Sequence, residues 1–456
     1  MMGRRVEQGS LFYEFRLEDR IPPDHLLRRV DALLDLSFVH EVMAKHYSAI
    51  GRPSVDPVLL IRMLLVGYLY GVRSERRLCE EVELNLAYRW FCRLGLDGRV
   101  PDHSTFTKNR HGRFRDSGIM RKLFERIVEQ CLDAGIAGTD HVVVDGSHFK
   151  ADANKQRCVK TNDELPRDGA SRAVRDYLAD LDDALPEPAG VVRWKPKAVS
   201  LTDPATAFSG KYGRYVFSYG LNVMVDSASG IILDARASAA RTAEEPIAAY
   251  RMIERVRERH GVQPRVLAAD TGYGSGHFLD WLERQGIEAH VPVIDHRHRK
   301  KRYLPRHAFA YDPQNDTYTC PQGKTLRRSG ARSGHATRIE ADRVPYYPSR
   351  SDCRPCPIRA DCAPSGLRKI SRSIHEPARD RARAREGTDA FVASTKLRRR
   401  VERVFACVKH HDDLHRVRLR GLRGADEQFL LATTARNLKR MVRLMGPRPE
   451  PVAIAA

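Results

Sequence analysis

Apolar residues in the first 136 positions recur at the three- and four-residue spacing of amphipathic helices. One predicted helix begins at Asp56-Pro57, where an N-cap acceptor precedes a proline at the first helical position, and it ends at Gly71. A second helix follows Ser74 and carries an apolar stripe: Leu78, Val82, Leu86 and Trp90. Two helices joined by a short turn also describe a helix-turn-helix that contacts DNA. Most such pairs are simple packing units, so both interpretations stay open.

From His141 the pattern changes to short apolar runs typical of strands. An acidic segment, 163–188, is expected to form a helix and a linker. The remaining predicted elements are a strand (141–145), a hairpin (212–225 and 231–236), a helix (243–259), a strand ending at 270, a helix (276–285) and a strand (288–293). With a late helix added, this order is that of an RNase H-like core, an α/β fold with a mixed sheet and flanking helices.

The formal net charge of +21 over 456 residues indicates a polyanionic partner. Between Arg368 and Arg423, 17 Lys or Arg residues stand against 7 Asp or Glu residues, so the excess is concentrated rather than spread evenly. A second basic run occupies 297–302. The alternative interpretation is a basic surface that only aids solubility, and the uneven distribution favours a binding surface.

The chain is expected to be cytoplasmic and to associate with the nucleoid, without contact with a membrane. Residues 1–14 lack the continuous apolar core of a secretory signal. The longest apolar run, 58–72, is interrupted by Arg62 and is too short to span a bilayer. Nine cysteines without an export signal indicate a reducing compartment rather than a disulfide framework.

Three acids occupy settings that predict chemistry. Asp145 ends the run Val142–Val144, Asp270 ends the run Val266–Ala269, and Glu402 lies in a basic helical stretch. Two carboxylates at strand ends and one on a late helix could meet in space, where like charges raise each other's pKa. A divalent cation such as Mg²⁺ relieves that repulsion and keeps positions open for water and phosphate. The set therefore points to metal-assisted phosphoryl transfer, although each acid alone could be a loop cap, a helix cap or a solvated charge.

Two cations share the predicted helix face of Glu402. Arg398 lies four residues before it and Lys409 seven residues after it, so both could hold phosphates beside the metals. Around Glu402 an apolar stripe would dock this helix on the sheet: Val401, Val404, Phe405 and Val408.

At these residues the chain resembles a DDE transposase of bacterial insertion sequences. In one group of these enzymes the third acid lies in a Tyr-x2-Arg-x3-Glu-x6-Lys signature. Arg398, Glu402 and Lys409 match that spacing, whereas Thr395 stands at the tyrosine position, so the role of the tyrosine is not carried over. The text around the first two acids (Asp145-Gly-Ser and Asp270-Thr-Gly-Tyr) and the segment 101–105 of the helical region are also similar. The resemblance covers about 35–440.

The resemblance implies that Asp145, Asp270 and Glu402 hold two Mg²⁺ or Mn²⁺ ions. One ion would activate a water and later a 3′-hydroxyl for in-line attack, and the other would stabilise the leaving oxygen. The activity implied is cleavage and strand transfer of double-stranded DNA at terminal inverted repeats, by a homodimer or a larger synaptic assembly. Arg398 and Lys409 would contact the DNA backbone.

Two other classes stay open. The chain could be a catalytically inactive, domesticated DNA-binding protein that keeps the fold, although all three acids occupy plausible settings. It could also be an RNase H-like nuclease that acts on RNA or on repair intermediates. No glycine-rich phosphate loop is present, which argues against ATP hydrolysis.

Four cysteines lie in a weakly periodic, Arg- and Pro-rich stretch between the last core strand and the helix of Glu402: Cys320, Cys353, Cys356 and Cys362. Their spacing suits a structural Zn²⁺ site, and a metal crosslink would stabilise a segment with few apolar residues. The alternative is four reduced cysteines in a loose loop. Four other cysteines lie on apolar helical faces and are expected in the core: Cys79, Cys92, Cys131 and Cys407.

Other candidates rank lower. Four further aspartates compete for the first two acid positions: Asp152, Asp203, Asp226 and Asp234. The last three lie at or near predicted turns, which makes them weaker candidates. Three histidines are expected on the surface or facing DNA rather than as ligands: His148, His410 and His411.

The predicted domain order follows from these assignments. Residues 1–136 form a helical DNA-binding or assembly domain, and 137–294 form the first part of the RNase H-like catalytic core. Residues 295–385 form a basic, Cys-containing insertion, 386–445 the final core helices with the third acid, and 446–456 a flexible tail.

Overall fold

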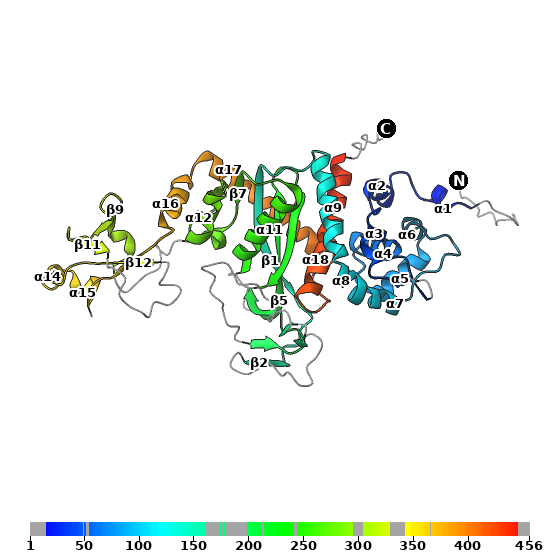
Figure 1. Ribbon diagram of the computed structural model, residues 1–456, viewed down its shortest axis with the longest axis horizontal. Helices are drawn as coiled ribbons and strands as arrows, with labels where there is room; N and C mark the ends of the chain where they lie inside the picture. Colours follow the sequence, from blue (N-terminus) through cyan, green and yellow to red (C-terminus); the bar gives the residue numbers. More distant parts are fainter. Residues whose placement is uncertain are drawn as a thin grey trace, which may run out of the picture.

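The chain is elongated in the computed structural model, with the N-terminal helices at one end, a mixed sheet in the middle and a small separate sheet at the other end (Figure 1). The structure describes residues 15–48, 50–51, 54–160, 174–175, 177–178, 198–211, 214–240, 244–294, 304–328, 343–364 and 366–445. The expected tail 446–456, the basic run 297–302 and nearly all of the acidic segment 163–188 lie outside these ranges. Within them, no helix combines the length and apolar character needed to cross a bilayer.

Short helices build the N-terminal region. They are α1 (Leu17–Arg20), α2 (Leu26–Leu33), α3 (Val39–Ala44), α4 (Pro57–Leu69), α5 (Glu75–Leu84), α6 (Leu86–Phe91), α7 (His103–Asn109), η1 (Arg110–Phe114), α8 (Arg115–Ser117) and α9 (Ile119–Asp133). As predicted, Asp56 caps α4 by accepting a hydrogen bond from the Val58 N–H at 2.8 Å. The prediction of one continuous helix after Ser74 is wrong, because the helix breaks at Asn85. The Asn85 side chain accepts from the N–H groups of Ala87 and Tyr88 and starts α6.

Helix α4 is buried along most of its length, so the predicted helix-turn-helix pair has one outward-facing member. In α4, Leu60 to Leu69 are all buried. In α5 only Leu78 and Val82 are buried, and its outer face carries a mixture of arginine and glutamate side chains. The burial of α4 agrees with the packing interpretation of this pair.

The central sheet has the RNase H-like order. Its strands run β6–β5–β1–β7–β8, with β4 paired to the start of β5. Strand β1 is antiparallel to β5 and parallel to β7, and β7 is parallel to β8. The bounds are β1 (His141–Lys150), β4 (Ala207–Lys211), β5 (Arg214–Asp226), β6 (Ile232–Ala239), β7 (Val266–Ala268) and β8 (Glu288–His290). A separate two-stranded ribbon joins β2 (Cys158–Lys160) to β3 (Ala198–Ser200).

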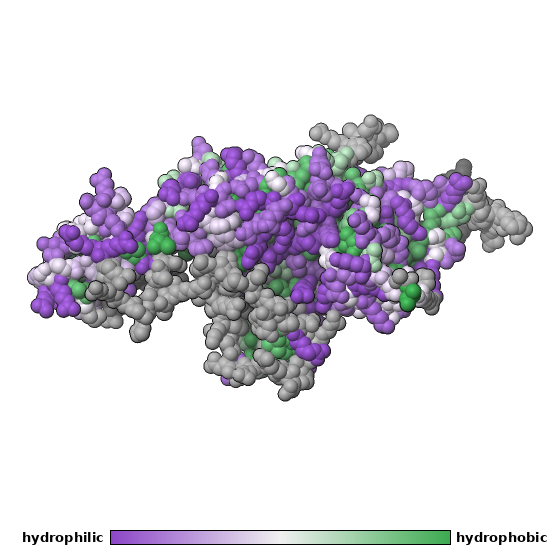
Figure 2. All heavy atoms as spheres, viewed as in Figure 1, coloured by the Kyte–Doolittle hydropathy of each residue, from purple (hydrophilic) through white to green (hydrophobic). Residues whose placement is uncertain are grey.

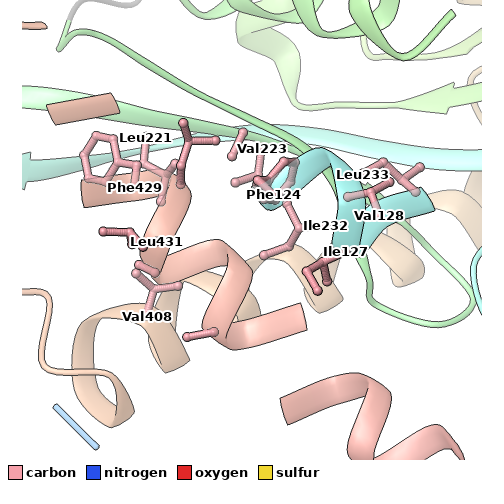
Figure 3. Packing of buried hydrophobic residues seen from close by; sticks show 14 of the residues in the cluster. Phe124, Ile127, Val128, Leu221, Val223, Ile232, Leu233, Val408, Phe429 and Leu431 are labelled. Atoms are coloured by element: carbon pink, nitrogen blue, oxygen red, sulfur yellow. The ribbon is translucent and has the colours of Figure 1, made fainter. Parts of the chain in front are cut away.

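Helices cover both faces of this sheet. They are α11 (Glu244–His260), η2 (Thr271–Tyr273), α12 (Gly276–Arg284), α16 (Glu376–Arg385), α17 (Asp389–Ala406), η4 (Cys407–His411) and α18 (Leu422–Met445). Helix α18 lies between the sheet and the N-terminal helices, where it packs on β6, α9, α4 and α2 (Figure 1). Figure 3 shows the resulting core, in which side chains of α9, β5, β6, η4 and α18 meet, including Phe124, Val223, Ile232, Val408 and Phe429.

Three of the four cysteines predicted in the core are buried: Cys92, Cys131 and Cys407. Cys79 packs against the same core but is only half-buried. Burial raises the pKa of the Cys92 and Cys131 thiols to about 12, so both stay protonated at neutral pH. These thiols therefore act as small apolar groups.

The cysteine-containing stretch folds into its own small sheet, which its weak periodicity did not predict. An antiparallel sheet with the order β13–β12–β11–β10–β9 encloses Phe309, Tyr318, Leu326, Tyr346 and Ile370. Its elements are η3 (Arg306–Ala308), β9 (Ala310–Asp312), β10 (Thr317–Thr319), β11 (Thr325–Arg328), β12 (Arg343–Tyr347), α14 (Arg350–Cys353), α15 (Arg359–Cys362) and β13 (Ile370–Ser373). Aromatic side chains make up most of this small core, so the stretch folds without long apolar runs in its sequence. Helix α16, which follows, packs on α12 of the central domain.

Candidate active site

Asp145 lies inside β1 rather than at its end, so the predicted strand end is wrong. Strand β5 continues to pair with β1 as far as Lys150, opposite Ser218, and this pairing keeps the backbone extended beyond the acid. The strand that ends near Asp145 is its neighbour β7. The last residue of β7 that pairs with β1 is Ala268, which lies opposite Val143. Because β7 stops there, one side of β1 is uncovered at the level of Asp145.

Asp270 follows β7 at the same level. Counting two residues onward from the paired Val143 and Ala268 reaches Asp145 on one strand and Asp270 on the other, so parallel pairing brings the two acids to one edge. Asp270 caps the short helix η2, because its Oδ1 accepts from the Gly272 N–H at 2.8 Å. Strand β7 ends at Ala268, two residues before the predicted end at Asp270.

Glu402 approaches this edge from α17. The predicted apolar stripe docks the helix, since Val401, Val404 and Phe405 are buried, and α17 packs on β1, β7 and β8. The Glu402 side chain itself is exposed, which differs from the acid held at a shared cation that the sequence predicted.

The pKa of Asp145 shows that the three acids share one electrostatic environment. This pKa is raised from 3.8 to about 6, chiefly by burial and to a smaller extent by the charges of Asp270 and Glu402, against the opposing effects of the Gly146 N–H and of Arg398. Asp270, Glu402 and Arg398 are therefore within electrostatic range of Asp145, although no three acids among the described residues stand close enough to share a cation.

Lys409 lies on the same face of β1 as Asp145. Its Nζ donates to Ser147 Oγ at 2.7 Å and lies 4.8 Å from the centre of the Phe149 ring. Alternate residues of a strand share a face, so Asp145, Ser147 and Phe149 all point toward α17, η4 and α18. Phe149 confirms this direction by packing on Phe429 of α18. Arg398 and Lys409 thus flank the acids, as predicted.

A fourth carboxylate, not singled out from the sequence, approaches from the opposite face. Glu245, in the first turn of α11, lies against the face of Gly146 and His148, with Oε1 of Glu245 4.0 Å from Nε2 of His148. The signal available in the sequence was the Glu244-Glu245-Pro246 helix start directly after the hairpin. The sequence alone did not show that this first turn of α11 lies near Asp145, because that proximity depends on the register of β1.

The competing acids are all engaged elsewhere. Asp152 pairs with Arg416 and Arg420, and Asp234 pairs with Arg121 and Arg255. Asp226 accepts from the turn N–H groups of Ala228 and Ser229, and Asp203 accepts from the Tyr219 hydroxyl at 2.5 Å. His410 and His411 are exposed, as predicted, and His148 is partly exposed beside Glu245.

The acid cluster has the donor chemistry that a hard divalent cation requires. Carboxylate oxygens are the preferred ligands of Mg²⁺, and the raised pKa of Asp145 reflects negative charge held partly out of water. As the side chains stand, no three His, Cys, Asp or Glu groups among the described residues lie close enough to share a metal ion. Binding would therefore draw the exposed Glu402 side chain inward.

The four predicted zinc cysteines are within electrostatic range of one another, although among the described residues they do not stand close enough to share a metal ion. Burial raises the pKa of Cys362, and the thiols of Cys353, Cys356 and Cys320 add to the rise. Cys320 is at a tight turn, where its Sγ accepts from the Lys324 N–H at 3.3 Å and Gly323 adopts a positive φ of 72°. An N–H group directed at the sulfur stabilises a thiolate, which is the form that binds metal.

Two stretches of the sequence match known families. Residues 15–112 match the family described as Transposase domain (DUF772), and residues 319–442 match the family described as Transposase DDE domain. The chain is a DDE transposase. The second match contains Arg398, Glu402, Lys409 and the four cysteines of this transposase. Asp145 and Asp270 lie outside both matches, so their assignment rests on the sheet register.

Solved structures similar to this transposase include a piggyBac transposase synaptic complex with hairpin DNA and a Mos1 transposase paired-end complex with the left transposon end. The first is 10% identical over 93% of this chain and 76% of that chain, with a TM-score of 0.34. The second is 13% identical over 53% of this chain and 60% of that chain, with a TM-score of 0.16. The transposase thus spans less than two thirds of the Mos1 chain. Among curated proteins, no sequence matches this one.

Proposed function

We propose that this transposase cuts and rejoins double-stranded DNA at the terminal inverted repeats of an insertion sequence, in a reaction that depends on Mg²⁺ or Mn²⁺. The proposal is supported by the register that brings Asp145 and Asp270 to one edge of an RNase H-like sheet, with Glu402 within electrostatic range of Asp145. These three carboxylates would hold two cations. When bound, the cations supply an activated nucleophilic oxygen and neutralise charge on the phosphate being attacked.

The chain's own groups position the DNA around that edge. Lys409 and Arg398 carry positive charge beside the acids and would hold the phosphates on either side of the cleaved bond. Hydrophilic side chains dominate the face of the molecule seen in Figure 2, in keeping with the basic composition of 368–423. The N-terminal helices would contribute DNA binding or assembly, within a homodimer or larger synaptic complex located on the nucleoid.

The direct test is strand cleavage of a duplex that carries the two ends of the element encoding this chain. We expect nicking at the repeat ends in the presence of Mg²⁺ and no nicking in EDTA or on a scrambled duplex. Binding without cleavage would support the inactive DNA-binding protein instead. Preferential cleavage of an RNA–DNA hybrid would support the nuclease alternative and overturn the proposal.

Lys409→Ala should weaken binding to element-end DNA and lower the salt dependence of that binding. Removing one phosphate contact reduces the slope of log K against log salt concentration by about 1. The measurement is fluorescence anisotropy over a range of salt concentrations. Lys324→Ala is the matched control, because that lysine lies in the separate small sheet and is half exposed. An unchanged slope for Lys409→Ala would remove this residue from the DNA contact.

The four-cysteine cluster is proposed to hold one structural Zn²⁺. We expect about one zinc per chain by atomic emission, and we expect Cys353→Ser or Cys356→Ser to lose it. Because a metal crosslink stabilises a sheet with so small a core, chelation should unfold β9–β13 before the central domain. Cys158→Ser, which changes an exposed cysteine outside the cluster, should keep the zinc. A zinc-free native protein of unchanged stability would contradict this assignment.

A further inference from the structure

Glu245 is held against the backbone of both acidic segments of the active site. A Cβ atom added to Gly146 would lie 3.1 Å from Oε1 of Glu245, and one added to Gly272 would lie 3.7 Å from its Oε2. Gly146 follows Asp145 directly, and Gly272 lies two residues after Asp270. One carboxylate therefore bridges the two strands at the level of the acids, and the missing side chain at Gly146 leaves room for it.

Two buried polar atoms in this part of the site have no hydrogen-bond partner among the described residues. The Tyr273 side chain is fully buried, and its hydroxyl has no hydrogen-bond partner among the described residues. Asn222 is also fully buried, its Oδ1 is likewise without a partner there, and this oxygen would lie 3.1 Å from a Cβ at Gly146. Burying such groups unpaired costs free energy, so their presence here indicates a ligand that the site binds.

The Tyr273 hydroxyl also locates the fourth acid relative to the others. After burial, the charges that raise the pKa of Tyr273 are those of Glu245, Asp145 and Asp270, in that order, whereas Arg398 lowers it. A single buried hydroxyl is thus within electrostatic range of three carboxylates that come from both faces of the sheet. Glu245 belongs to the same cluster as the two aspartates and is not a separate surface charge.

We propose that Glu245 is a fourth carboxylate of the cation site and binds a divalent cation from the α11 face, opposite Glu402. The inference rests on the proposed function, because it takes the cation site at Asp145 and Asp270 as given. Its position in the first turn of a 17-residue helix fixes the backbone, so only the side-chain torsions need to adjust. Because no three of the described acids share an ion as they stand, the side chains of Glu245 and Glu402 would both turn toward the cation, one from each face of the sheet.

The test is Mn²⁺ binding to the full-length, metal-free protein without DNA, measured by isothermal titration calorimetry. We expect Glu245→Gln to weaken Mn²⁺ binding by about 10-fold or more, on the scale seen when groups that support metal sites are removed. Glu258→Gln, at the exposed far end of the same helix, should bind like the wild type. Circular dichroism and thermal unfolding in EDTA would show whether each variant keeps the fold.

A second variant keeps the proposal testable if Glu245→Gln is unstable. Gly146→Ala leaves every charge in place but forces the Glu245 carboxylate to move, since the new Cβ meets Glu245 Cγ and Oε1 at 3.1 Å. It should weaken Mn²⁺ binding although no charge is removed, and an unchanged Mn²⁺ affinity of Gly146→Ala would contradict the inference.

The outcomes separate this inference from the proposed function. If Asp145→Asn loses Mn²⁺ while Glu245→Gln binds it with wild-type affinity and stoichiometry, the fourth-ligand inference is wrong and the three-acid site stands. If the wild type itself binds no Mn²⁺, the cation-dependent reaction fails and the inference fails with it.

Discussion

Asp145→Asn should lower the rate of DNA strand cleavage by about 10³-fold or more while leaving the fold intact. The side chain keeps its size and its place on β1, but it loses the negative charge directed at the edge that β7 leaves uncovered. The measurement is single-turnover cleavage of element-end DNA with Mg²⁺. Asp140→Asn is the matched control: Asp140 lies just before the same strand and makes an exposed pair with Arg265 at 2.6 Å, so cleavage should be unchanged.

Stability should change in the opposite direction to activity. The pKa of Asp145 is raised to about 6 in the folded chain, so the stability associated with this group is fully present below about pH 4 and is lost as the pH rises through 6. Above pH 6 without divalent cation, the wild type carries a cost that asparagine lacks, and Asp145→Asn should be more stable by about 1–3 kcal/mol. Added Mg²⁺ should stabilise the wild type but not the variant. Near-normal cleavage by Asp145→Asn would remove Asp145 from the active site.

Arg110→Ala should lower the free energy of unfolding by about 3–5 kcal/mol. The guanidinium joins the N-terminal helices to α18, with Nε 2.5 Å from Glu427 Oε1 and Nη1 3.0 Å from Glu75 Oε1. The side chains of Arg110 and Glu427 are 6% and 7% exposed, so truncating the arginine leaves a carboxylate out of water without a counter-charge. Urea unfolding followed by tryptophan fluorescence measures the loss.

Two further variants show whether the buried charge is the cause. Arg110→Ala combined with Glu427→Gln should recover part of the loss, because the uncompensated carboxylate is then gone. Arg77→Ala breaks an exposed pair with Glu81 within α5 and should cost less than about 0.5 kcal/mol. A cost for Arg110→Ala as small as that of Arg77→Ala would mean that water reaches Glu427 and that α18 does not depend on this pair.

The dependence on Arg110 bears on function as well as stability. Helix α18 packs on β6 of the sheet and on α9, α4 and α2 of the N-terminal region. Because η4 and α18 lie on the same face of β1 as Asp145, loosening α18 would also loosen the support of Lys409 beside Ser147. We therefore expect Arg110→Ala to weaken DNA binding at temperatures where the variant is still folded.

Local patterns in the sequence were sufficient for much of this protein. Caps such as Asp56 and the apolar stripe of Val401, Val404 and Phe405 depend on neighbours within a few residues, so they could be recognised before the structure was known. The order of strands and helices in the core could be predicted for the same reason, since each element carries its own periodicity in the sequence. The three acids were identified because two follow apolar runs in the sequence and the third lies in a spaced Arg-Glu-Lys signature.

Only the tertiary structure decided how strands register and which faces meet. The pairing of Val143 with Ala268 places Asp145 level with Asp270, and the long pairing with β5 carries β1 past the acid. Glu245 lies against Gly146 only because β1 turns this glycine toward α11, and the buried pair of Arg110 with Glu427 joins residues far apart in the chain. Such contacts depend on how whole layers of the fold pack against one another. Local sequence patterns do not reveal this packing.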